Sequence, residues 1–200
     1  ITTLDNPARD GKSVRLLVWG SKGLVPYSFE GEAVMVRTYE QCVDACNRIG
    51  RNYSIMGFDT ERVTYIPPYH QQGTSKPEAA IVQLAVDTDL CFIFVVHCWP
   101  ELYRPFAELM SSPAIKKLAN FPTQDLKSLA ARFPALDLRC GDHGIVSLAS
   151  LVASQFTVSG HGLETMLAEV AGLHLNKLID HRLWEVKVLS PRQVRNSSRS

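Results

Sequence analysis

The sequence predicts an α/β fold, in which a mixed β-sheet is flanked by helices. Hydrophobic residues make up 46% of the 200 residues, which is enough to bury the core of one globular domain. Strand-like runs follow one another in the first half of the chain, and helical patterns alternate with short strands in the second half. Together these patterns are typical of one mixed sheet covered by helices.

The first thirty residues differ in composition from the rest of the chain. Residues 1–30 mix Pro, Gly and Lys around a single strand-like run at 14–19. We interpret them as an N-terminal arm that precedes one domain over residues 31–200. That domain is expected to open with a short strand at 33–36.

A capping box predicts the first helix. Thr38 is followed three residues later by Gln41, and the apolar spacing after it indicates a helix that ends at Gly50. Apolar runs with the length of buried strands follow at 54–58, 81–86 and 91–96.

The second half alternates between predicted helices and strands. A helix-like stretch after Pro100 continues to Met110, and Pro105 predicts a kink or a break within it. Short strands are expected at 115–118 and 136–140. Helices are expected at 123–133, at 145–156, at 163–171 with Gly172 closing it, and from Ser190 onward.

Composition excludes several functional classes. The formal net charge is +1, so any contact with nucleic acid must be local. The five cysteines form no CxxC pair, which argues against a zinc site or a disulfide framework, and Cys42 and Cys46 are expected to be buried. No apolar run approaches the roughly 20 residues that span a bilayer. Because the first residue is Ile and not Met, we expect a piece of a longer protein. The cysteine usage indicates a reducing compartment, so we expect an intracellular protein, nuclear or cytoplasmic.

Asp59 and Glu61 come directly after a predicted buried strand. Successive strand residues point to opposite faces, so these two carboxylates project to the same side. Adjacent carboxylates repel unless a cation lies between them, and Mg²⁺ prefers such oxygen ligands. From spacing alone, the favoured interpretation is a loop in which Asp59 caps a turn and Glu61 pairs with Arg62 or another surface base.

The surrounding sequence favours the metal site. Residues 55–61 (IMGFDTE), followed by residues 77–85 (PEAAIVQLA), resemble the first motif and the next strand of the RNase D and Werner family of 3'-5' exonucleases. The resemblance extends over roughly residues 33–200. It implies a ribonuclease H-like mixed sheet flanked by helices, with four acidic residues that bind divalent ions.

Residues 116–126 (KKLANFPTQDL) resemble the second family motif, an acid near the start of a helix that follows a short strand. The resemblance implies that Asp125 is the third acidic ligand. Without the family, the simpler interpretation is that Asp125 complements the dipole of the first helical turn.

The last family motif is recognisable but altered. Residues 189–200 (LSPRQVRNSSRS) resemble the start of a helix that carries a Tyr and, four residues later, an Asp. Those positions fall on Asn196 and Ser200. In the family, two divalent ions about 4 Å apart hold the scissile phosphate, so losing one acid and the water-orienting phenol implies weakened catalysis. Asp142, Asp180 and Glu185 stay open as substitutes, and a Tyr/Asp pair beyond Ser200 stays open as well.

Two functional classes therefore agree with the resemblance. The first is a pseudo-exonuclease that keeps the fold to bind nucleic acid or protein, and the second is an active exonuclease that uses Mg²⁺ or Mn²⁺. The expected partners are single-stranded RNA or DNA 3' ends, with a protein partner or a homodimer for a scaffold role and no membrane. Basic residues suited to phosphate contacts are Arg192, Arg195 and Arg199, although a solvated helix face explains them equally well.

Overall fold

The computed structural model divides the chain into two compact units. The described backbone comprises residues 2–7, 13–18, 25–27, 29, 31–63 and 78–175, and side chains are described for residue 29 and for the last two ranges. One unit combines residues 1–28 with 148–178, and the other combines residues 29–147 with 179–200. Each unit is described by itself.

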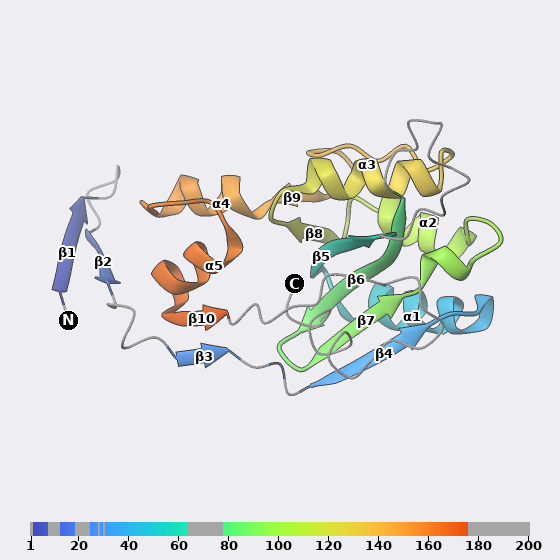
Figure 1. Cartoon of the computed structure of the whole chain (residues 1–200), viewed down its shortest axis with the longest axis horizontal. Coiled ribbons are helices and arrows are strands. Elements are labelled where there is room, and N and C mark those ends of the chain that lie inside the picture. The colour runs from blue at the N-terminus through green and yellow to red at the C-terminus, as the bar shows by residue number, and fades with distance from the viewer. Residues whose placement is uncertain are drawn as a thin grey trace. The chain divides into compact units, whose positions relative to one another are not determined.

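The second unit contains a six-stranded sheet in the order β4-β7-β6-β5-β8-β9 (Figure 1). Its strands are β4 (Glu32–Val36), β5 (Ile55–Arg62), β6 (Ala79–Asp87), β7 (Leu90–Phe94), β8 (Lys116–Ala119) and β9 (Ile145–Ser147). β5, β6 and β7 pair antiparallel, whereas β4, β8 and β9 each join in parallel. The sheet is mixed, which confirms the predicted fold class.

Three helices cover one face of this sheet: α1 (Tyr39–Asn52), α2 (Arg104–Ser111) and α3 (Pro122–Arg132). Their apolar stripes pack with strand residues such as Phe58, Leu84 and Phe94 in one buried cluster. Alternate residues of the central strands, among them Ile81 and Ile93, form a second cluster on the opposite face. A strand buried on both faces has a continuous apolar sequence, which is how β6 and β7 were predicted.

The capping box of α1 is confirmed. Thr38 Oγ1 accepts the backbone N–H of Gln41 at 3.3 Å, and Gln41 Oε1 accepts the backbone N–H of Thr38 at 3.2 Å. The helix continues past Gly50 to Asn52. Cys42 and Cys46 lie on its buried face, as expected.

Three predicted elements are wrong in part. Residues 145–156 were predicted as one helix, but the first three form β9, because they extend the sheet beside β8, and the helix α4 follows (Leu148–Gln155). No strand forms at 136–140 within the described residues, where a turn and irregular backbone leave the apolar side chains Leu136 and Leu138 packed on the core. Pro105 does not kink a helix: it stands at the start of α2, where its missing N–H costs no bond.

The first unit has small sheets of its own. β1 (Thr2–Pro7) pairs antiparallel with β2 (Ser13–Val18), close to the strand expected at 14–19, and β3 (Val25–Tyr27) pairs in parallel with β10 (Leu173–Leu175). The helix expected over 163–171 is found as α5 (Leu163–Met166) followed by the π-helical turn η3 (Leu167–Ala171), which Gly172 closes at φ 68°. The helix expected from Ser190 lies outside the described residues. Among the described residues, no helix is long and apolar enough to cross a bilayer.

Candidate active site

The first two acids lie within a strand and not just after it. Asp59 and Glu61 are half-buried residues of β5, opposite Gln83 and Ile81 of β6 in the strand register. Ile81 belongs to the cluster on the face away from α1, α2 and α3, and alternation places both acids on that same face. The predicted same-side projection of the two carboxylates therefore agrees with the strand geometry.

The third acid approaches β5 along an open strand edge. β8 pairs with β5 only from Ile55 to Gly57, because the chain leaves the sheet after Ala119 and enters α3 at Pro122. β8 does not pair with the following half of β5, and α3 packs against β5. Asp125, in the first turn of α3, is thereby brought to this edge.

Thr60 holds the Asp125 carboxyl in place. The Thr60 hydroxyl donates to Asp125 Oδ1 at 2.8 Å, and the Thr60 backbone N–H donates to the same carboxyl group. Both residues are buried, with 7% and 9% of their surface exposed. Asp125 therefore does more than complement a helix dipole, because it joins the helix to the strand that carries the other two acids.

The Asp59 side chain is in hydrogen-bond contact with the Asp125 carboxyl. Burial raises the pKa of Asp125, while the hydrogen bonds from Thr60, the contact with Asp59 and the positive charge of Arg62 act in the opposite direction. Two carboxyl groups this close share a proton or are separated by a cation.

The donor set fits a hard divalent ion by chemistry. Asp59 and Asp125 are in contact, and Glu61 projects from the same face two residues along β5. All three offer carboxylate oxygen, the ligand that Mg²⁺ and Mn²⁺ prefer. Within the described residues, no three His, Cys, Asp or Glu side chains gather closely enough to enclose a metal ion.

Three residues near the acids were not predicted. Thr60 positions Asp125, and Gln83 lies opposite Asp59 with 2% of its surface exposed. Neither polar atom of the Gln83 side chain has a hydrogen-bond partner in the part of the chain that the structure describes. Phe121, which precedes α3 by one residue, is 55% exposed. Two of these three residues carry a signal in the sequence. Gln83 is a polar residue inside the apolar run of β6, and Phe121 is an aromatic residue one turn before Asp125.

The strand before α3 carries a buried lysine. Lys117 lies in β8 and has none of its surface exposed. Its ammonium group donates to the backbone oxygens of Ser112 at 2.6 Å and His143 at 2.9 Å. Burial and the neighbouring Lys116 lower the pKa of Lys117 to about 8.

The altered last motif cannot be placed beside these acids. Asn196, Ser200, Arg192, Arg195 and Arg199 lie outside the described residues, as do Asp180 and Glu185. Asp142, the other open substitute, is exposed in the loop that leads to β9.

Sequence and structure comparisons identify similar proteins. The family described as 3'-5' exonuclease matches residues 33–196. The Drosophila melanogaster protein named Exonuclease 3'-5' domain-containing protein 2 is 27% identical over 152 residues. The match covers 72% of this chain and 23% of that protein, so this chain spans under a quarter of the relative's length.

Solved structures with the same fold include the Nibbler EXO domain of Aedes aegypti. It superposes with a TM-score of 0.70 at 15% identity, covering 86% of this chain and 84% of that one. Escherichia coli RNase D, an exoribonuclease involved in structured RNA processing, superposes with a TM-score of 0.62 at 19% identity, covering 84% of this chain and 40% of that one. The catalytic core of RRP6 from Trypanosoma brucei superposes with a TM-score of 0.63 at 14% identity, covering 98% of this chain and 56% of that one.

Proposed function

This chain belongs to the 3'-5' exonuclease family, and we propose that it is an RNase D-like domain that engages single-stranded 3' ends but hydrolyses them poorly. The proposal rests on one contrast. Asp59 and Asp125 lie in contact and Glu61 projects from the same face of β5, whereas Asn196 and Ser200 stand where the family pattern has Tyr and Asp.

The described residues support binding at the acidic site. Thr60 fixes Asp125 through two hydrogen bonds, so the carboxylate is held before any ligand arrives. A divalent ion bound there would supply positive charge to stabilise the scissile phosphate. Arg62 already contributes positive charge close to Asp125.

The altered positions explain the proposed loss of hydrolysis. Serine in place of Asp at residue 200 removes a negative charge and a strong oxygen ligand, and Asn196 lacks the phenol that helps to orient the attacking water. The chain then has three of the four acidic ligands of the family pattern. Binding of a 3' end needs fewer of these groups than catalysis does, because only catalysis requires an oriented nucleophile.

Nucleic-acid contacts are proposed from two features. Phe121 offers an exposed ring one turn before Asp125, and base stacking on such rings tolerates any sequence. Arg192, Arg195 and Arg199 would neutralise phosphates, so replacing each by Gln should lower the salt dependence of binding by about one unit of slope.

Hydrolysis is tested directly with 3'-labelled single-stranded RNA and DNA in Mg²⁺ and in Mn²⁺. We expect little cleavage by the natural sequence and a gain in the double variant Asn196→Tyr, Ser200→Asp. The matched control is Asp137→Asn, at an exposed acid that pairs with Arg139 at the surface. Robust cleavage by the natural chain that disappears in Asp59→Ala would instead establish the alternative, an active metal-dependent exonuclease, which the contact between Asp59 and Asp125 favours.

Binding is measured separately, by fluorescence anisotropy with labelled single strands in Ca²⁺ to suppress cleavage. We expect Phe121→Ala to weaken binding about tenfold, because one stacked base contributes roughly 1–3 kcal/mol. Tyr39→Ala, at another exposed aromatic, is the control and should leave the affinity unchanged. No measurable affinity for either nucleic acid would reject the binding proposal and direct attention to a protein partner or a homodimer, which light scattering detects.

A further inference from the structure

A second cluster of reactive side chains, which includes none of the three acids, lies in the 3-10 turn η2 (Val96–Cys98) that follows β7. Cys98 Sγ is 3.2 Å from Nε2 of the neighbouring His97. The other ring nitrogen, Nδ1, is 3.2 Å from the backbone oxygen of Ala80 in β6. A thiol, an imidazole and a fixed carbonyl thus form a chain of hydrogen bonds.

The direction of these hydrogen bonds is set by the carbonyl. The Ala80 oxygen can only accept, so Nδ1 of His97 carries the proton and donates it. In the neutral ring, Nε2 is then an acceptor, and the Cys98 thiol is the donor to it. This is the order needed for an imidazole that removes the proton of a nucleophilic thiol.

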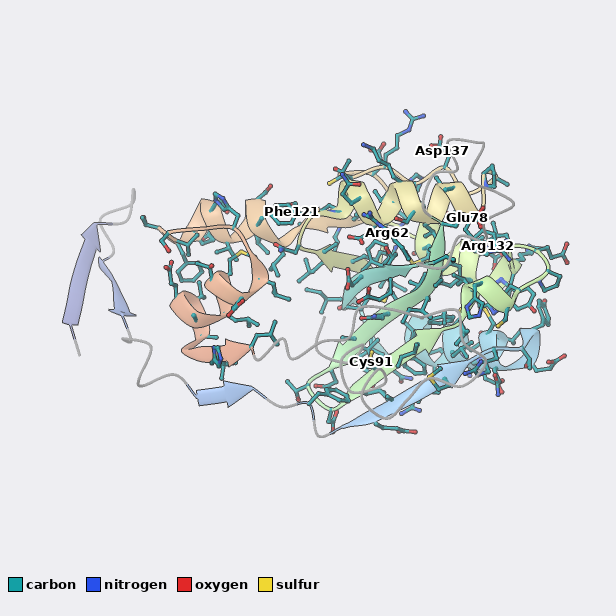
Figure 2. The ribbon with its side chains drawn as sticks, in the orientation of Figure 1. Arg62, Glu78, Cys91, Phe121, Arg132 and Asp137 are labelled. Atoms are coloured by element: carbon teal, nitrogen blue, oxygen red, sulfur yellow. The ribbon has the colours of Figure 1, made fainter. Side chains whose placement is uncertain are left out.

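Arg132 at the end of α3 is hydrogen-bonded to the backbone of the turn. Its guanidinium donates to three backbone oxygens of the turn region, those of Val96 at 3.3 Å, His97 at 3.4 Å and Trp99 at 2.5 Å. Glu78 lies 4.0 Å from the same guanidinium, and Figure 2 shows the two residues side by side. The backbone of the turn is therefore joined to α3, and the His97 ring is joined to the sheet through Ala80.

Cys98 also differs from the other cysteines in access. Cys42, Cys46 and Cys91 are buried, whereas Cys98 and Cys140 are exposed. Within the described residues, the Cys140 thiol has no hydrogen-bond partner, so only Cys98 combines exposure with a base. Reactive thiols in proteins are those with both properties.

We propose that Cys98 is a modification site, at which a small hydroperoxide oxidises the thiol to a sulfenic acid with His97 as the proton carrier. His97 Nε2 takes the thiol proton, and the sulfur attacks the terminal oxygen of the hydroperoxide. The S–O bond forms as the O–O bond breaks, and the imidazolium returns the proton to the departing alkoxide. Thiol and hydroperoxide give sulfenic acid and alcohol, with sulfur oxidised by two electrons and the peroxide reduced by two.

The internal control for this reaction is Cys140. The chain is treated with a small excess of tert-butyl hydroperoxide, sulfenic acid is trapped with dimedone, and labelling at each cysteine is followed by peptide mass spectrometry. We expect Cys98 to be labelled about a hundredfold faster than Cys140, the lower end of what a positioned proton carrier contributes. In denaturing urea the two rates should become equal, because the contact with His97 is lost.

The variant His97→Gln separates proton transfer from exposure. Glutamine keeps an amide N–H that can donate to Ala80 but cannot carry the thiol proton, so labelling of Cys98 should fall to the rate of Cys140. His161→Gln, at an exposed histidine of the other unit, should leave both rates unchanged. Labelling of Cys42, Cys46 or Cys91 would report unfolding of a variant, in which case His97→Asn replaces it. Equal rates at Cys98 and Cys140 in the folded natural chain, or a Cys98 rate that survives both His97 substitutions, would overturn the proposal.

Discussion

At the scale of single residues, the hydrogen bond from Thr60 to Asp125 links the two elements that carry the acids. Thr60→Val keeps the shape of the side chain but leaves the buried carboxyl without the hydroxyl donor at 2.8 Å. We expect a loss of about 1.5–3 kcal/mol in the free energy of unfolding, the usual contribution of a hydrogen bond to a charged group. Thr60→Ser retains the hydroxyl and should lose less. Urea denaturation of the metal-free chain measures both, and equal losses would show that the methyl group matters and the hydrogen bond does not.

Gln83 presents the opposite case, a buried amide without a partner among the described residues. Its neighbours in register on β5 and β7 are Asp59 and Ile93, and most of the surrounding cluster is apolar. Replacing Gln83 by Leu removes two unpaired polar atoms at similar volume, so we expect the unfolding free energy to rise by about 1–2 kcal/mol. Gln83→Ala, which leaves a cavity, serves as the comparison and should be less stable than Gln83→Leu. A Leu variant that is less stable than the natural chain would contradict this reasoning.

At the scale of elements, Lys117 joins the end of α2 to the loop before β9 through Ser112 and His143. Its pKa is about 8 in the folded chain and about 10.4 in an unfolded one, so the unfolded state binds more protons between these values. Stability therefore rises with pH from about 8 to about 10.4, by up to about 3 kcal/mol. Below pH 8 the folded chain carries a buried ammonium group, and the cost of burying this charge lowers its stability. The rise should be absent in Lys117→Met and present in Lys127→Met, an exposed control. Urea unfolding at a series of pH values tests this, and parallel curves for the natural chain and Lys117→Met would contradict it.

Local sequence signals predicted those elements whose causes are local. The capping box at Thr38 placed the start of α1, and the continuous apolar runs placed β6 and β7. β9 was missed because Ile145–Ser147 takes its strand form from pairing with β8, a partner nearly thirty positions earlier that periodicity cannot reveal. Pro105 illustrates a second limit, because proline is common in the first turn of a helix although it disrupts a helix interior.

For the three acids as well, the sequence predicted what depends on local features and missed what depends on tertiary contacts. Alternation along one strand is local, so it sufficed to place Asp59 and Glu61 on one face. The approach of Asp125 depends on the edge of β5 that β8 leaves open, and the role of Thr60 depends on that approach. These are tertiary facts, and only the family resemblance brought Asp125 to attention from the sequence.

At the scale of the whole molecule, the sheet of the second unit is organised around β6. This strand lies between β5 and β7, and every residue from Ala79 to Leu84 is buried. We expect its amide hydrogens to exchange slowest in this unit, at least about tenfold slower than those of the edge strand β4, because β6 is released only when the core opens. Hydrogen exchange followed by mass spectrometry tests this, with the exposed helical segment at residues 150–155 as a fast reference. Slower exchange in β4 than in β6 would mean that the core is organised differently.

Because β8 ends early, the position of Asp125 depends on the length of the connection between β8 and α3. Only Asn120 and Phe121 separate β8 from Pro122, and Pro122 cannot donate a hydrogen bond to a sheet. Two extra residues before Pro122, of strand-forming type, would let β8 continue in register beside Asp59 and Thr60 and displace Asp125 from the edge of β5. An insertion of two residues would then disable the acidic site while every acidic residue stays in the chain, so loop length matters as much as residue identity when relatives are judged active or inactive.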